Sequence, residues 1–176
     1  MTKSNIALIG MPGAGKSTVG VVLAKRLGLA FVDTDLLLQR SAGRRLQQIL
    51  EQEGLPAFRN REEATLLGLQ EQASVIATGG SVVYSAAGMA ALAAQAHIVW
   101  LQLPLAELER RVGDLTSRGI VIEPGASFAS LFTERQPLYQ RYAEQVVEVG
   151  GKTLEQVVAE LVDRLTPLLA EPAAQP

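Results

Sequence analysis

A glycine-rich segment near the amino terminus has the residue types that hold nucleotide phosphates. Residues 10–18 read GMPGAGKST and satisfy the pattern G-x-x-x-x-G-K-[S/T] with Gly10, Gly15, Lys16 and Ser17. Glycines let successive backbone N–H groups curl around phosphate oxygens without a Cβ in the way, and the following helix adds the positive end of its dipole. Lys16 would bring a positive charge to the β- and γ-phosphates, and the Ser17 hydroxyl would bind Mg²⁺. The segment therefore predicts a site for a nucleotide and its metal ion.

Two carboxylates follow the second predicted strand. Residues 31–35 read FVDTD, so Asp33 and Asp35 emerge where that strand ends. Because ligands of open α/β sheets bind at the carboxyl ends of the strands, one aspartate can hold Mg²⁺ through water while the other accepts a hydroxyl proton. Either aspartate could instead cap the helix expected to begin before Leu36.

Composition excludes several kinds of site. The 176 residues include no cysteine and one histidine, His97, which excludes disulfides, thiolate metal sites and clusters of histidine ligands. Sixteen basic and 18 acidic residues give a net charge of −2, so no overall field draws the protein to nucleic acid or to a membrane. No signal-peptide pattern is visible, and the apolar stretches are far shorter than the roughly 18 residues that span a bilayer. We expect a cytoplasmic monomer whose partners are small molecules.

Short apolar runs alternate with helical patterns along the chain. Strands are expected at runs rich in Ile, Val or Leu, at 5–10, 30–33, 74–78, 98–103 and 146–149. Such continuous apolar runs suit strands buried on both faces of a parallel sheet. Helices are expected at 15–27, 35–41, 45–53, 57–72, 85–95, 105–113, 127–143 and 153–169. The alternation predicts an α/β fold, a three-layer sandwich around a five-stranded parallel sheet.

The chain is predicted to form one domain over residues 1–170. A tail over 171–176 is expected to be disordered. Residues 113–127 are polar and carry three glycines, which predicts a loop or lid near 113–125.

Six motifs in order resemble those of the shikimate kinases, P-loop enzymes similar in fold to nucleoside monophosphate kinases. They are GMPGAGKST at 10–18, FVDTD at 31–35, FRNREE at 58–63, IATGGSVV at 76–83, RRVGDLTSRG at 110–119 and ERQPLY at 134–139. The first motif is common to many nucleotide-binding families, whereas the whole set is far more specific. The resemblance implies an acceptor-binding segment near 34–62 and a lid near 113–125. It also implies phosphoryl transfer from MgATP to a hydroxyl of shikimate, which gives shikimate 3-phosphate in aromatic amino acid biosynthesis.

On the nucleotide side, the resemblance assigns roles residue by residue. It implies ATP contacts at Gly13, Ala14, Gly15, Lys16, Ser17, Thr18, Arg111 and Arg118. Arg111 would lie against adenine, with Arg110 as the alternative. Arg118 would be a lid arginine that reaches the transferring phosphate and, with Lys16, takes part in catalysis. Mg²⁺ would be held by Ser17 and, through water, by Asp33.

On the acceptor side, the resemblance makes Asp35 the residue that grips the shikimate hydroxyls and serves as catalytic base. Arg59 and Arg135 would bind the carboxylate, and the backbone of Gly79 and Gly80 would contact the ring hydroxyls. The chemistry is sound, because a guanidinium fork binds a carboxylate through two hydrogen bonds and glycine permits close approach of the backbone. Both arginines lie in charged runs, so a purely solvated role is the alternative for each.

Two positions depart from the family pattern. The family has three glycines where this chain has Gly79, Gly80 and Ser81, so a hydroxyl and a Cβ are added beside the acceptor pocket. The proline that usually follows the lid arginine is replaced by Gly119, which removes a restraint on the backbone.

Two other functions stay open at this point. A P-loop kinase for another hydroxylated acceptor, such as gluconate, would keep residues 10–17 but would not need Arg59 and Arg135 together. A non-catalytic nucleotide-binding paralogue would keep the fold, but it would not need Lys16, Asp35 and both arginines.

Overall fold

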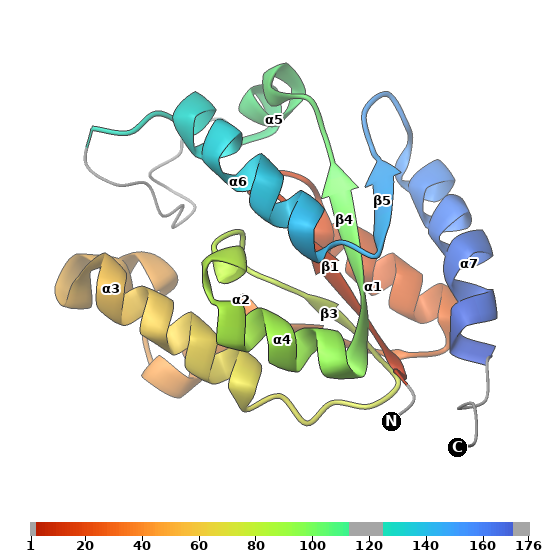
Figure 1. Cartoon of the computed structure of the whole chain (residues 1–176), viewed down its shortest axis with the longest axis horizontal. Coiled ribbons are helices and arrows are strands. Elements are labelled where there is room, and N and C mark those ends of the chain that lie inside the picture. The colour runs from red at the N-terminus through yellow and green to blue at the C-terminus, as the bar shows by residue number, and fades with distance from the viewer. Residues whose placement is uncertain (1–2, 113–124, 171–176) are drawn as a thin grey trace.

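The computed structural model describes residues 3–112 and 125–170. Its centre is a five-stranded sheet in the order β2-β3-β1-β4-β5, which confirms the predicted α/β fold (Figure 1). All four pairings between neighbouring strands are parallel. The strands are β1 (Asn5–Ile9), β2 (Ala30–Asp33), β3 (Ser74–Ala77), β4 (Ala96–Gln102) and β5 (Gln145–Glu148).

The sheet forms where the sequence has continuous apolar runs. Every residue of β1 and β3 is buried, and β1 lies in the middle of the sheet between β3 and β4. Leu8 is opposite Ala77 on one side and Val99 on the other. A strand covered on both faces gains from an apolar side chain at every position, so the runs do not alternate with polar residues. The predicted strands are all present, with ends shifted by one or two residues.

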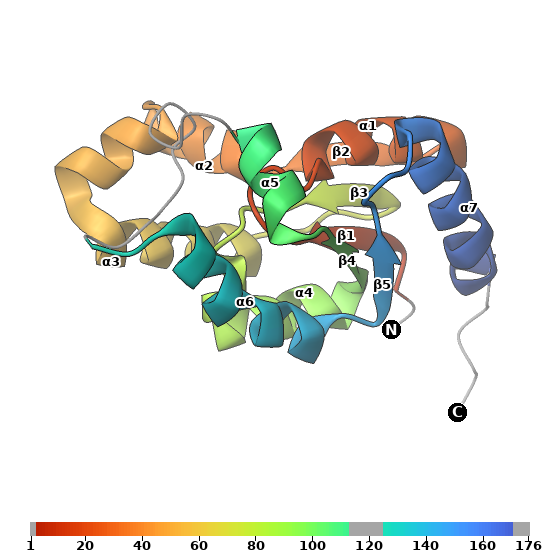
Figure 2. The same cartoon turned by 90° about the horizontal axis from the view of Figure 1, so that it is seen from above.

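Helices cover both faces of the sheet and make the outer layers of the predicted sandwich. They are α1 (Lys16–Leu27), α2 (Thr34–Ala42), α3 (Leu46–Leu67), α4 (Ala86–Gln95), α5 (Leu105–Val112), α6 (Phe128–Tyr142) and α7 (Leu154–Ala170). In Figure 2, α1 and α7 lie on one face of the sheet, and α4 and α6 lie on the other. Among the described residues, no helix has the length and apolar character needed to cross a bilayer.

Helix α3 contains the two predicted helices, 45–53 and 57–72, as two stretches on either side of a bend, and only the end of the second stretch differs from the prediction. The structure has one helical segment with a kink at Gly54, whose backbone is at φ 79° and ψ 170°. That conformation is open only to glycine at little cost, and Pro56 follows in the next turn. The helix ends at Leu67, before Gly68, rather than at 72. A short 3₁₀ helix, η1 (Val82–Tyr84), was not predicted.

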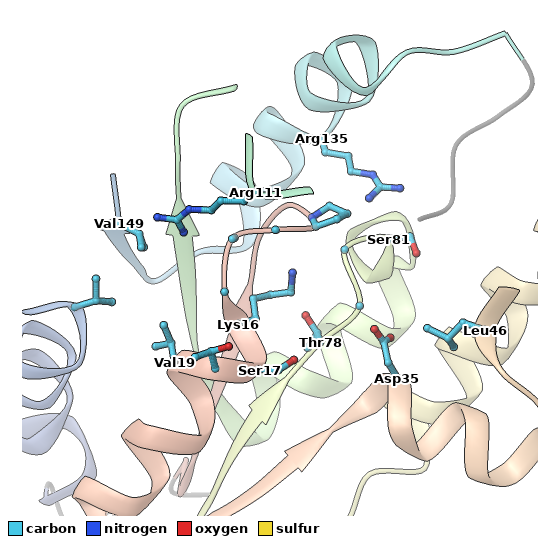
Figure 3. A pocket seen from close by; sticks show the side chains of 18 of the residues that line it. Lys16, Ser17, Val19, Asp35, Leu46, Thr78, Ser81, Arg111, Arg135 and Val149 are labelled. Carbon is cyan, nitrogen blue, oxygen red and sulfur yellow. The ribbon is translucent and has the colours of Figure 1, made fainter. Parts of the chain in front are cut away.

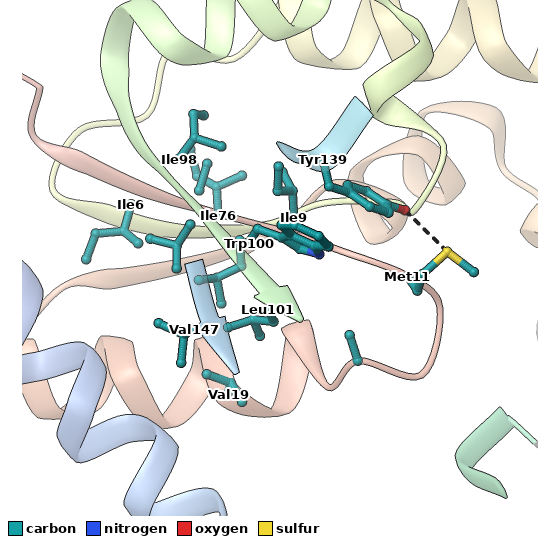
Figure 4. Packing of buried hydrophobic residues seen from close by; sticks show 14 of the residues in the cluster. Ile6, Ile9, Met11, Val19, Ile76, Ile98, Trp100, Leu101, Tyr139 and Val147 are labelled. Atoms are coloured by element: carbon teal, nitrogen blue, oxygen red, sulfur yellow. Dashed lines mark hydrogen bonds between the residues drawn. The ribbon is translucent and has the colours of Figure 1, made fainter. Parts of the chain in front are cut away.

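A stacked aromatic pair in the core lies close to the loops that follow β1 and β3. The rings of Trp100 on β4 and Tyr139 on α6 stack with their centroids 5.8 Å apart (Figure 4). Tyr139 is fully buried, and its hydroxyl donates a hydrogen bond of 2.7 Å to the carbonyl of Gly80. The same hydroxyl lies 3.8 Å from the sulfur of Met11. Packing of the core therefore fixes the turn after β3 against the loop after β1.

Candidate active site

A cavity of about 590 Å³ lies at the carboxyl ends of the strands. It is lined by the loop after β1 and the start of α1, by Asp35 on α2, by the turn after β3, and by residues of α3, α5, α6 and the β5–α7 loop. Figure 3 shows Arg111 and Val149 on one side of the loop after β1, and Asp35, Ser81 and Arg135 on the other. The cavity thus has two halves that meet at Lys16.

The loop after β1 has the backbone that a phosphate cradle requires. Gly13 and Gly15 have φ values of 84° and 91°, which side chains disfavour, and Gly15 precedes the first turn of α1. Lys16 is 9% exposed, and its ammonium donates hydrogen bonds to the carbonyls of Gly10 (2.8 Å) and Met11 (3.0 Å). Burial lowers the pKa of Lys16 to about 8, although the charge of Asp35 opposes this shift.

Asp33 uses its two carboxylate oxygens for two tasks. Oδ1 accepts hydrogen bonds from the N–H groups of Asp35 (3.0 Å) and Leu36 (3.4 Å), so Asp33 is the N-cap of α2, as the capping alternative predicted. Oδ2 accepts a hydrogen bond of 2.7 Å from the hydroxyl of Ser17. An aspartate oxygen and a serine oxygen held this close suit Mg²⁺, which binds few protein oxygens and fills its remaining positions with phosphates and water. Capping and metal binding are therefore compatible.

Asp35 reaches the floor of the acceptor half. A Cβ added to Gly79 would lie 2.8 Å from Asp35 Oδ1, so a larger residue there would have to displace the Asp35 carboxylate. The N–H of Gly79 donates a hydrogen bond of 3.2 Å to the hydroxyl of Thr34, which ties the turn after β3 to the start of α2. Burial, reinforced by the charge of Asp33, raises the pKa of Asp35 to about 6, while Lys16 opposes the shift.

Glu62 is a second buried carboxylate, and the sequence analysis missed it. It is 5% exposed, and its Oε1 lies 2.7 Å from the position that a Cβ on Gly79 would take. The hydroxyl of Ser81 donates a hydrogen bond to Glu62 Oε2. Burial raises the pKa of Glu62 to about 7, against the hydrogen bond from Ser81. A signal was available, because Phe58, Glu62 and Leu66 follow one another at intervals of four along the buried stripe of α3.

Ser81, the third residue of the Gly79-Gly80-Ser81 turn, adds a contact that glycine cannot make. Its side chain lines the cavity but is turned to the carboxylate of Glu62. Through this bond, the turn after β3 is connected to α3.

Arg59 and Arg135, the two arginines expected to bind the acceptor's carboxylate, both contact the side chain of Tyr84. Arg135 of α6 is 1% exposed, lines the cavity, and has Nη1 3.0 Å from the position of a Cβ on Gly80. The Cζ atoms of Arg59 and Arg135 lie 4.3 Å and 5.2 Å from the centroid of the Tyr84 ring. Two residues 76 positions apart in the chain are therefore brought to the same place. Tyr84 was not predicted, because no motif marks the residue that joins two distant helices.

Arg111 lines the cavity on the same side of the loop after β1 as Val149 (Figure 3). It lines the cavity together with Val149, Lys152 and Leu154 of the β5–α7 loop and α7. Its guanidinium forms an ion pair with Glu107 one turn earlier on α5. With this ion pair formed, the Arg111 side chain faces the β5–α7 loop.

The structure brings most of the predicted site residues together. Those that line the cavity are Gly13, Ala14, Gly15, Lys16, Ser17, Thr18, Asp35, Gly79, Gly80, Arg111 and Arg135. Within residues 3–112 and 125–170, the lining does not include Asp33, which bonds to Ser17 beside it, or Arg59, which contacts Tyr84. Arg118 and positions 113–124 of the predicted lid lie outside the described residues, as does the tail over 171–176.

Comparison with known protein families gives one result over nearly the whole chain. The family model described as shikimate kinase matches residues 12–166.

Individual relatives agree with this match. The chain is 40% identical over 162 residues to a shikimate kinase of Saccharopolyspora erythraea, covering 90% of this chain and 92% of that one. It is 39% identical over 171 residues to a shikimate kinase of Pseudomonas entomophila, covering 93% and 97%. Among solved structures, shikimate kinase from Acinetobacter baumannii in complex with shikimate superposes with a TM-score of 0.87 at 31% identity, over 97% of each chain.

Proposed function

This chain belongs to the shikimate kinase family, which makes it a small-molecule kinase, and from that membership we propose that it transfers the γ-phosphoryl group of ATP to a hydroxyl of shikimate. The product would be shikimate 3-phosphate. One observation carries the proposal for this chain's own residues: a single cavity joins a phosphate-binding loop to a pocket that contains Asp35 and Arg135.

The acceptor half has the groups that a cyclic hydroxy acid requires. Arg135 lines the cavity, and the guanidinium of Arg59 lies against the same Tyr84 ring. Together they provide the paired N–H donors and the positive charge that bind a carboxylate. The backbone at Gly79 and Gly80 lies close to Asp35 and Arg135, so ring hydroxyls can reach main-chain groups there. We assign the carboxylate of shikimate to the arginines and its hydroxyls to Asp35 and the glycine turn.

Asp35 is the proposed catalytic base. It lines the cavity on the acceptor side, and Lys16 lies near enough for its charge to lower the pKa of Asp35. With a pKa of about 6, Asp35 is largely ionised near neutral pH and is still basic enough to accept the proton of a hydroxyl as that oxygen attacks. The position of Asp35 in the cavity and its raised pKa both support this role.

The nucleotide half would bind and orient the phosphates of ATP. Backbone N–H groups of the loop over 13–15 and the first turn of α1 would face the phosphate oxygens, and Lys16 would exchange its bonds to the Gly10 and Met11 carbonyls for bonds to phosphate. Ser17 would hold Mg²⁺ directly and Asp33 would hold it through water. When bound, the metal ion neutralises charge on the β- and γ-phosphates. Arg111 would pack against the adenine ring.

A kinase assay with a panel of acceptors tests the proposal. Purified protein is given MgATP and, in separate reactions, shikimate, quinate or gluconate; ADP release is followed by a coupled enzyme assay, and the product is identified by ³¹P NMR. We expect turnover with shikimate and a new phosphomonoester signal, and little turnover with the other acids. Turnover only with gluconate would assign the protein to a different kinase activity. Nucleotide binding without turnover of any acid would show a non-catalytic protein.

A further inference from the structure

The ring of Tyr84 lies between residues that come from different helices. Tyr84 is the last residue of η1, in the turn after β3, whereas Arg59 belongs to α3 and Arg135 to α6. Both guanidinium groups lie within 6 Å of the ring centroid, at 4.3 Å and 5.2 Å. This is the range in which the negative face of an aromatic ring attracts a cation.

The hydroxyl of Tyr84 also forms hydrogen bonds, which orient the guanidinium of Arg135 relative to the ring. Its oxygen accepts a hydrogen bond of 3.2 Å from Nε of Arg135 and donates one of 2.8 Å to Oε1 of Glu134. The assignment of donor and acceptor is fixed, because a guanidinium only donates and an ionised carboxylate only accepts. The single hydroxyl proton therefore points to Glu134, and a lone pair faces Arg135.

Two guanidinium groups held near one another repel. In a flexible arrangement, each long side chain would move toward solvent, and both would have to be ordered again when an anion binds. A tyrosine ring has few rotatable bonds and presents a rigid negative face, so it can hold both cations at little entropic cost. Because Arg135 is also held through Nε, its terminal nitrogens remain directed toward the turn at Gly80, where Nη1 is found.

We propose that Tyr84 is a positioning residue that holds Arg59 and Arg135 side by side, in the geometry that receives the acceptor's carboxylate. The inference rests on the proposed function, since it takes the acceptor to be a carboxylic acid. The described contacts of Tyr84 are with Arg59, Arg135 and Glu134, so its role is to act through the arginines. The turn after β3 thus has two roles in the proposed acceptor site. Its glycines line the cavity, and Tyr84 contacts the arginines that would bind the carboxylate.

The consequence is a change in acceptor affinity alone. Loss of the ring removes an attraction shared by two cations, which corresponds to about a tenfold weaker binding of the acid. The nucleotide half and Asp35 do not contact Tyr84 through any bond described above, so ATP affinity and kcat should stay unchanged. A residue that only supported the fold would instead lower stability and affect both substrates.

Calorimetric titration with shikimate tests the proposal without relying on turnover. The variants are Tyr84→Leu, which removes the ring, and Tyr84→Phe, which keeps the ring and removes the hydroxyl. Tyr142→Leu is the matched control, because Tyr142, the last residue of α6, is also half-buried and has a guanidinium, that of Arg141, 5.5 Å from its ring centroid. We expect the dissociation constant for shikimate to rise about tenfold in Tyr84→Leu and about threefold in Tyr84→Phe, and to stay unchanged in Tyr142→Leu. Binding of ADP and the thermal midpoint should be similar in all four proteins.

The outcomes separate the two proposals. If the unmodified protein binds ADP but not shikimate, the proposed function is overturned and the role of Tyr84 with it. If the unmodified protein binds shikimate and Tyr84→Leu binds it equally well, only the role of Tyr84 is overturned. Equal losses of ADP and shikimate binding in Tyr84→Leu would also overturn it, because they would indicate a structural role.

A double-mutant cycle covers the case in which Tyr84→Leu does not fold. Lysine has no Nε donor, so Arg135→Lys already lacks the bond to the Tyr84 hydroxyl. Adding Tyr84→Phe to Arg135→Lys should then cost nothing further in shikimate affinity. Full additivity of the two substitutions would show that the hydroxyl does not act through Arg135.

Discussion

Burial shifts the pKa values of Asp35 and Lys16 toward each other. Removal from water disfavours the charged form of each, so the pKa of Asp35 rises to about 6 and that of Lys16 falls to about 8. Each charge partly offsets the other's shift. Between these values both groups are ionised, which is the state that the proposed reaction needs: a base for the hydroxyl proton and a cation for the phosphates.

Replacing Asp35 with asparagine should separate chemistry from nucleotide binding. The amide keeps the size of the side chain but cannot accept the hydroxyl proton, so kcat should fall by about 10²- to 10⁴-fold. Affinity for ADP should be nearly unchanged, as measured by calorimetry. Asp163→Asn on α7 is the control and should behave like the unmodified protein. A loss of ADP binding as large as the loss of kcat would contradict the role of Asp35 as a base.

The pH profile of kcat/KM for the acceptor should be bell-shaped. Below about pH 6 to 7 activity falls, because Asp35 takes up a proton and can no longer accept one; Glu62, with a pKa of about 7, lies beside it, so the two carboxyls titrate as a pair. Above about pH 8 activity falls again, because Lys16 loses its charge in the free enzyme. Initial rates from pH 5 to 10 at fixed ionic strength give both limbs. A flat profile from pH 5 to 7 would show that no carboxyl with a raised pKa controls the reaction, which would contradict the role given to Asp35 with a pKa of about 6.

Among the helices, α3 contributes most to the proposed acceptor half, because it contains both Arg59 and Glu62. Its kink at Gly54 separates Ile49 from Phe58, and these two side chains pack in one small apolar cluster with Leu38 of α2. One ion pair crosses the same bend, from Glu53 to Arg61, and Glu53 also binds Arg44, which precedes the helix. The bend therefore determines where the later turns of α3, with Arg59 and Glu62, face the cavity.

Replacing Gly54 with alanine should strain this bend. At φ 79° and ψ 170° an alanine is disfavoured by about 1–3 kcal/mol, although no atom blocks its Cβ at closer than 3.9 Å. We expect the thermal midpoint to fall by roughly 3–10 °C and the acceptor KM to rise, with ATP KM unchanged. Glu51→Ala, at an exposed position of the same helix, is the control. An unchanged midpoint in Gly54→Ala would show that the helix can straighten there without cost.

The elements were largely predictable from the sequence, and the contacts between them were not. Strands such as β1 and β3 are buried on both faces, so their apolar runs identify them locally, and the phosphate loop is marked by its glycines and Lys16. The division of α3 at Gly54 was predicted correctly, because Gly54 and Pro56 both suit a break, whereas its end at Leu67 was placed five residues too late. Glu62 and Tyr84 were missed because their roles arise from partners on other elements, which local patterns do not contain.

At the scale of the whole molecule, both halves of the site depend on one edge of one sheet. The loops after β1, β2 and β3 meet there because parallel strands end at the same edge. The central strand β1 leads directly into the phosphate loop, so ligand binding at this edge is coupled to the stability of the most buried part of the fold.

Nucleotide binding should therefore stabilise the whole chain. At a free ATP concentration one hundred times its dissociation constant, the native state gains about 2.7 kcal/mol, which corresponds to a rise of roughly 5–10 °C in the thermal midpoint. In Lys16→Met this rise should nearly vanish, because the charge that contacts the phosphates is lost. Lys25→Met, the same substitution at an exposed position of α1, should keep the full rise. An equal rise in all three proteins would place the nucleotide elsewhere.

In the proposed complex, Arg59 and Arg135, which are distant in the chain, bind the carboxylate of an acceptor positioned for phosphoryl transfer. The most direct test compares kcat/KM for shikimate with that for its carboxamide, in the unmodified protein and in Arg59→Ala and Arg135→Ala. We predict a preference for the acid of about a hundredfold in the unmodified protein, since a charged hydrogen bond contributes about 1.5–3 kcal/mol. Each alanine variant should lose most of that preference. If both variants discriminate between acid and amide as strongly as the unmodified protein does, the arginines do not bind the carboxylate.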